Sequence, residues 1–257
     1  MLVAGRHVAL AFALLLALLA PGAASCGVDA FFVHGFFAGQ TPFSRLKADG
    51  GPEGLCPALM DALAGVARTK APHMPLRQEM AQDFLRAGIV DLYFSFVEAG
   101  AVPPKGLAFG EAVLESPLAV VSWDGKLAGD AVVFSPRTVG VVEGSWEEQV
   151  ISAMRTRLHG RCRVRSYPSR DALINELSRR RIASALVPAC TAGTLKAAAG
   201  GVAVSGPLQD WGLGMLVPVF REDDVAGRAR FAKMLDRLRQ SQDLHRLLQL
   251  WLPEEER

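Results

Sequence analysis

The sequence has 257 residues, and half of them are hydrophobic, which is ample apolar material for a packed core. It carries 28 basic and 26 acidic residues, a formal net charge of +2, with no basic tail or stripe. This balance lacks the signature of nucleic-acid binding, so we expect no nucleic-acid partner. The four cysteines include no close pair, which excludes a metal site of the CxxC kind.

Residues 1–25 are predicted to be a secretory signal peptide and not part of the fold. Arg6 precedes an apolar run over 8–20, and small residues follow up to Ser25. This order is typical of a secretory signal, and the run is shorter than the ~20 apolar residues of a membrane-spanning helix. Cleavage after Ser25 removes only one charged residue, Arg6, and lowers the net charge from +2 to +1. We expect an exported protein, either soluble or lipid-anchored through Cys26.

The first third of the mature chain alternates between strand and helix patterns. Runs of β-branched and aromatic residues predict strands, and apolar residues at helical spacing predict helices. Parallel strands need crossover helices, so this order favours a parallel sheet flanked by helices. The predicted elements are a strand over 29–35, a helix over 55–67, a short strand between 72 and 75, a helix over 80–88 and a strand over 89–96.

A second alternating set follows the proline-rich break at 103–106. It predicts a second α/β lobe, with connections near 117 and 213 and a cleft between the lobes. We place the first lobe at 26–117 plus 212–257 and the second at 118–211. The predicted strands are 117–122, 131–134, 139–142, 162–166, 183–188 and 213–219, and the helices are 145–158, 171–181, 191–199, 225–238 and 242–252.

The stretch 138–158 is the clearest single unit, a buried strand followed by a Gly-Ser turn and a helix. Ser145 with Glu148 three residues later fits a capping box, so Ser145 is the predicted N-cap. A helix start leaves backbone N–H groups unpaired, where a small polar or anionic ligand can bind. The alternative is a turn that only caps its helix, and Glu147 with Glu148 already places negative charge there.

Two cysteines of the second lobe, Cys162 and Cys190, leave two alternatives open. Export permits disulfides, so these two residues could form a bridge. One begins a predicted strand and the other follows one, so they could instead lie at opposite ends of the sheet as free thiols.

Short motifs are spread along the whole mature chain. They are TPFS at 41–44, GL at 54–55, GIVD at 88–91, VGVVEGS at 139–145 and LWLP at 250–253. In order and spacing they resemble the solute-binding proteins of polar amino-acid ABC transporters, family 3 of the periplasmic binding proteins. The resemblance implies a type II two-lobed α/β fold, each lobe a mostly parallel sheet flanked by helices. It also implies a periplasmic monomer without a cofactor that captures a small polar solute and delivers it to an ABC permease.

The same resemblance implies where a ligand would lie, although the family's charged anchors are missing. The family's carboxylate-binding arginine falls at Lys105, which offers a point charge and no bidentate fork. The family's acidic residue falls at Pro188 or Ala189, neither of which can accept a charged hydrogen bond from a ligand. A small organic anion or another polar compound is therefore favoured over a standard amino acid. The expected ligand-binding residues are Phe37, Ser95, Phe96, Glu98, Lys105, Gly144, Ser145 and Trp146.

Two other functional classes are alternatives to solute capture. Lobes of this type also occur as sensor or accessory modules, which here would act through a separate membrane partner. Some relatives of the fold are dehydratases, but the histidines show no triad spacing, and neither HExxH nor GxSxG is present. The prediction is a protein that is not an enzyme.

Overall fold

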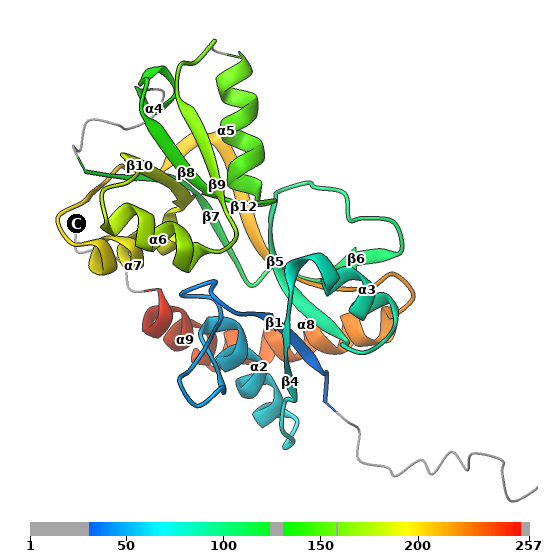
Figure 1. The fold of residues 1–257 in the computed structure, drawn as a ribbon. Coiled ribbons are helices and arrows are strands. Elements are labelled where there is room, and N and C mark those ends of the chain that lie inside the picture. The colour runs from blue at the N-terminus through cyan, green and yellow to red at the C-terminus, as the bar shows by residue number, and fades with distance from the viewer. Residues whose placement is uncertain (1–30, 124–130, 158, 253–257) are drawn as a thin grey trace, which may run out of the picture. The chain divides into compact units, whose positions relative to one another are not determined.

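The structure is a computed structural model that describes residues 31–123, 131–157 and 159–252. The predicted signal peptide and Cys26 lie outside the described residues. In the described part, ten strands join in one sheet whose main order is β4-β1-β5-β12-β7-β10-β8-β9 (Figure 1). Among these residues no helix combines the length and apolar character needed to cross a membrane.

The first half of this sheet is a parallel set closed by one antiparallel strand. β1 pairs in parallel with both β4 and β5, and β12 runs antiparallel to β5 and β6. A small hairpin, β2–β3, follows β1. The elements here are β1 (His34–Phe37), β2 (Arg45–Leu46), β3 (Pro52–Glu53), α2 (Leu55–Val66), β4 (His73–Leu76), η1 (Gln78–Met80), α3 (Ala81–Arg86), β5 (Leu92–Glu98), β6 (Leu107–Phe109), α8 (Val225–Gln240) and α9 (Asp243–Trp251).

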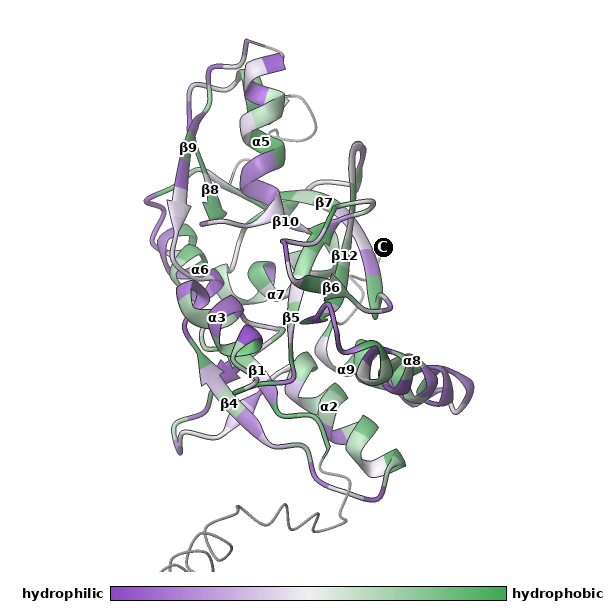
Figure 2. Cartoon of the chain, turned by 90° about the vertical axis from the view of Figure 1, so that its right-hand side faces the viewer, coloured by the Kyte–Doolittle hydropathy of each residue, from purple (hydrophilic) through white to green (hydrophobic). Residues whose placement is uncertain are grey.

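The second half repeats the pattern on the other side of β7 and β12. β8 pairs in parallel with β9 and β10, and β10 runs antiparallel to β7. In Figure 2 the central strand β8 is hydrophobic, whereas the edge strand β9 is largely hydrophilic. The elements are β7 (Leu114–Ser122), α4 (Ala131–Phe134), β8 (Thr138–Val142), α5 (Trp146–Arg157), β9 (Arg163–Tyr167), α6 (Arg170–Ser178), β10 (Ser184–Pro188), α7 (Ala189–Ala199), β11 (Ala203–Val204) and β12 (Leu208–Arg221).

β7 and β12 connect the two halves. The start of β7 pairs with β12 at Leu216, and its end pairs with β10, so one strand serves both sets. The predicted boundaries at 117 and 212 fall inside these two strands, and their position as lobe boundaries stays a prediction. Each half has its own buried clusters, with Phe220 and Phe231 central to one cluster of the first half and Leu186 and Ile151 central to one of the second.

Most predicted elements are confirmed with shifted ends, but one is wrong. The run Ala131–Phe134, predicted as a strand, forms the short helix α4. Val132 and Val133 are both fully buried, which successive residues of a strand with one solvent face cannot achieve. Of the first predicted strand, 29–35, residues 29–30 lie outside the described residues, 31–33 are not in a strand, and β1 begins at His34. Cys162 and Cys190 are free thiols, so the bridge alternative is not adopted.

Candidate functional site

The turn between β8 and α5 caps its helix as the sequence predicts. Gly144 takes a positive φ of 67°, which a residue with a side chain rarely adopts. The Ser145 hydroxyl accepts a hydrogen bond from the Glu148 N–H at 3.3 Å. The Glu148 carboxylate in turn accepts from the Gly144 N–H at 2.7 Å. The Glu148 carboxylate therefore already accepts from one of the N–H groups at this helix start.

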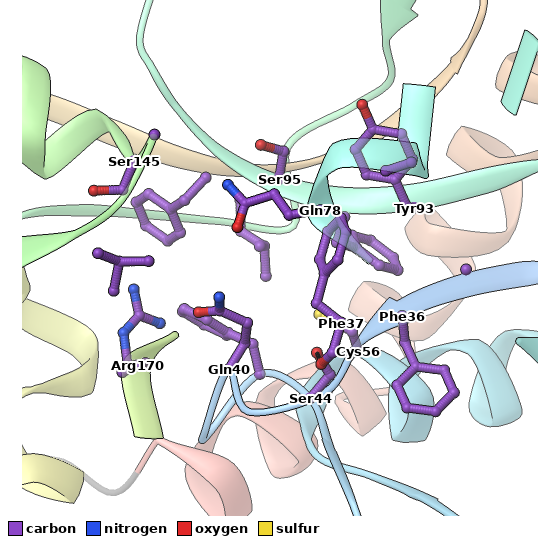
Figure 3. A pocket seen from close by; sticks show the side chains of 18 of the residues that line it. Phe36, Phe37, Gln40, Ser44, Cys56, Gln78, Tyr93, Ser95, Ser145 and Arg170 are labelled. Carbon is purple, nitrogen blue, oxygen red and sulfur yellow. Dashed lines mark hydrogen bonds between the residues drawn. The ribbon is translucent and has the colours of Figure 1, made fainter. Parts of the chain in front are cut away.

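A cavity of about 240 Å³ lies beside this turn. Its walls come from both halves of the sheet, with the β1 and β5 ends on one side and the α5 and α6 starts on the other (Figure 3). The side chains are mainly aromatic or uncharged and polar. The lining residues include Phe36, Phe37, Phe43, Tyr93, Phe94 and Phe96 as aromatics and Gln40, Ser44, Gln78, Gln82, Ser95 and Ser145 as polar groups.

Two charged side chains, Glu147 and Arg170, also line the cavity and pair with each other. Arg170 Nη2 donates to Glu147 Oε1 at 3.0 Å, and the side chains are only 4% and 1% exposed. The guanidinium also lies over the ring of Phe43, with 5.1 Å from Cζ to the ring centroid. Arg170 Nε and Nη1 and Glu147 Oε2 have no hydrogen-bond partner within the described residues. Figure 3 shows the guanidinium pointing into the same space as the Gln40 and Gln78 amides.

A second series of hydrogen-bonded side chains borders the cavity; it is buried at His34 and ends at the exposed Asp61. His34 Nδ1 lies 2.9 Å from His73 Nδ1, and His73 Nε2 lies 3.1 Å from the Asp61 carboxylate. A carboxylate only accepts, so in neutral His73 the Nε2 carries the proton and the Nδ1 accepts from His34. Burial first, and the charge of His73 second, lower the pKa of His34 well below its ordinary value. His34 is therefore neutral at pH 7, and its unprotonated Nε2 has no hydrogen-bond partner among the described residues.

Several contacts across the cavity join the loop after β1 and the strand β5 to the second half. Asp171 N donates to Gly39 O at 3.0 Å, and its carboxylate accepts from Thr41 N at 3.3 Å. The rings of Phe96 and Trp146 stack with centroids 6.2 Å apart. These contacts hold the two walls of the cavity against each other.

Five of the eight sequence-predicted site residues line this cavity, namely Phe37, Ser95, Phe96, Gly144 and Ser145. The other three do not. Trp146 is buried beneath the cavity wall against Phe96, and Glu98 and Lys105 are exposed. The Lys105 carbonyl accepts from Arg86 in a loop outside the cavity. The role of all eight in ligand binding stays a prediction.

Sequence reasoning missed Arg170, Glu147 and Gln40 as cavity residues. One available signal was the position of Arg170, the first residue of α6. A cation there opposes the helix dipole, so it needs a negative partner nearby. From the sequence pattern, Glu147 is expected only to place negative charge at the start of its own helix.

Comparison with solved structures identifies the architecture. A mutant of ArgBP from T. maritima matches with a TM-score of 0.69 and 18% identity, over 88% of this chain and 96% of that chain. A periplasmic binding protein of Salmonella typhimurium with high arginine specificity matches with a TM-score of 0.72 and 16% identity, over 86% and 98%. The chain has the two-lobed fold of the periplasmic binding proteins.

The binding-protein fold covers nearly the whole of the described chain, which confirms the predicted two-lobed α/β class. Another match is an ancestral amino-acid-binding protein described as a precursor of cyclohexadienyl dehydratase, with a TM-score of 0.72 and 16% identity over 86% of this chain and 95% of that one. No family model and no curated protein matches the sequence. Structural similarity at such low sequence identity establishes the fold but not the ligand.

Proposed function

We propose that this chain is the extracytoplasmic solute-binding component of an ABC-type uptake system, a periplasmic monomer that captures a small polar solute between its lobes. The observation that carries the proposal is the cavity, which is lined from both halves of the sheet by aromatic faces and uncharged polar groups. Such a combination of apolar walls and a few convergent polar groups is typical of small-molecule sites. The predicted signal peptide supports the same function, as does the structural similarity to the substrate-binding protein of an amino acid ABC transporter and to a periplasmic His/Glu/Gln/Arg/opine family-binding protein.

The fold also supplies a means of capture. β7 and β12 are the strands shared by both halves, so bending within them would open and close the cavity. The closed, solute-bound state would then present a different surface to a membrane permease from that of the open state. Among the described residues that line the cavity, the charged side chains form one ion pair, and no nucleophile is shown beside an activating base.

A thermal-shift screen of small polar solutes tests the proposal. We expect at least one solute to raise the melting temperature of the wild type, because a ligand that binds only the folded state stabilises it. The variant Ser95→Trp fills the cavity from β5 and should abolish that shift. Ser152→Trp, on an exposed position of α5, is the matched control and should keep it. A folded, ligand-free protein that responds to no solute would contradict solute capture.

A further inference from the structure

The ion pair in the cavity wall, Arg170–Glu147, is incompletely satisfied by the protein. One hydrogen bond of 3.0 Å joins the two side chains. Two guanidinium nitrogens and one carboxylate oxygen have no hydrogen-bond partner among the described residues, although both side chains are more than nine-tenths buried. Buried polar atoms in folded proteins are nearly always paired, so unpaired atoms of two side chains that line a cavity point to a partner in the ligand.

The unpaired atoms define what that partner must offer. Arg170 can only donate hydrogen bonds, and the unpaired oxygen of Glu147, Oε2, can only accept them. Because the two side chains touch, a ligand group that satisfies both must carry an acceptor and a donor close together. A planar amide or urea group has this arrangement, with a carbonyl oxygen beside an N–H.

The charge of the lining favours an uncharged ligand. Arg170 and Glu147 cancel, and the other polar side chains are glutamine, serine and tyrosine. His34 adds no charge, because burial keeps it neutral. The Gly144 N–H at the α5 start is already bonded to the Glu148 carboxylate. Among the described residues that line the cavity, Arg170 is the only cation and is already paired, and the Gly144 N–H is already bonded to a carboxylate, so an anion would gain little there.

Building on the proposed function, we infer that the captured solute has no net charge and bears a carboxamide or urea-type group that binds the Arg170–Glu147 pair. Its carbonyl oxygen accepts from Arg170, and its N–H donates to Glu147 Oε2. A ligand carboxylate at Arg170 would meet the Glu147 carboxylate, and a ligand ammonium at Glu147 would meet the guanidinium. An amide makes the same hydrogen bonds without either repulsion and without dehydrating full charges.

Three probes of matched length test the inference by calorimetric titration of the wild type at pH 7.5. Succinamide is the neutral diamide, succinate the dianion and 4-aminobutyrate the zwitterion. We expect succinamide to bind at least tenfold more tightly than the other two. Equal or tighter binding of succinate or 4-aminobutyrate overturns the inference and leaves solute capture standing. Binding of none of the three also overturns it, and the thermal-shift screen then decides separately on solute capture.

Variants of Arg170 and Glu147 test whether this ion pair causes the preference for succinamide. Glu147→Gln leaves Arg170 without its carboxylate, so we expect succinate affinity to rise at least tenfold and succinamide affinity to fall. Asp223→Asn removes one negative charge from an exposed position after β12, and it should keep the wild-type preference. If Glu147→Gln does not fold, the double variant Glu147→Gln/Arg170→Gln removes both charges together. It should lose succinamide affinity tenfold without gaining succinate, and unchanged selectivity in these variants contradicts the assignment.

Discussion

Acidification should destabilise this protein through His34 specifically. His34 is fully buried, and its pKa lies well below the ordinary value of 6.5. Below pH 6.5 the unfolded chain therefore binds a proton at this position that the folded chain does not bind. The free energy of unfolding rises with pH wherever the unfolded state binds more protons, so this contribution is present above pH 6.5 and is lost as the pH falls.

The magnitude follows from one proton and the ordinary pKa. Between pH 7.5 and 5.5 the ratio of total to neutral unfolded chains rises about tenfold. This lowers the unfolding free energy by about 1.4 kcal/mol, the equivalent of one pKa unit, as long as His34 stays neutral when folded. The assay is urea unfolding followed by tryptophan fluorescence at both pH values. We compare the wild type with His34→Gln, which removes the titrating imidazole and keeps a polar side chain.

The measured quantity is the loss of unfolding free energy between pH 7.5 and 5.5, compared between the wild type and His34→Gln. The wild type should lose about 1.4 kcal/mol more stability than His34→Gln over this pH interval. His245→Gln removes an exposed histidine of α9 and should keep the wild-type pH dependence. Equal losses in the wild type and His34→Gln would refute the reasoning, because they would show that His34 binds its proton equally well in both states.

Three further substitutions test the packing and the helix ends. Gly214→Ala places a methyl group against the rings of Phe96 and Trp146 and should cost about 1–3 kcal/mol by overpacking, measured as a lower urea midpoint. Gly65→Ala, inside α2 with open space around it, should instead stabilise the protein by about 0.4–1 kcal/mol, and a loss there would contradict the helical environment. Asp224→Ala removes the side chain that accepts from Gly227 N at the start of α8, and it should lower the unfolding free energy by about 1 kcal/mol; an unchanged value would show that the cap contributes nothing.

The parts of the fold that the sequence predicts well are those fixed by local patterns. The stretch 138–158 combines a β-branched run, a Gly-Ser turn and a helical apolar spacing, and the structure contains β8, the Ser145 cap and α5 there. The run Ala131–Phe134 shows the limit of such patterns. β-branched residues favour strands mainly through the surface on which they pack, and here two consecutive valines are buried together in a helical turn.

The cavity was only partly predictable, because its charged pair depends on tertiary structure. Glu147 and Arg170 are separated by 23 positions and meet only because β8 and β9 are adjacent parallel strands. Motif positions transferred from a family locate the strand ends but not the direction of every side chain. This is why Ser95 and Ser145 line the cavity while Glu98 and Lys105 are exposed outside it.

The geometry of these two strands also explains why the pair consists of these residues. Because β8 and β9 are parallel, the helices that follow them, α5 and α6, both begin at the same edge of the sheet. The start of a helix carries partial positive charge, so Glu147 is favoured in the first turn of α5 and Arg170 is disfavoured at the first position of α6. Glu147 compensates its own helix start and the guanidinium of Arg170 together. Removing Glu147 alone should therefore lower stability more than removing Arg170 alone, and the reverse order in unfolding experiments on Glu147→Gln and Arg170→Gln would show that the helix starts do not set the balance.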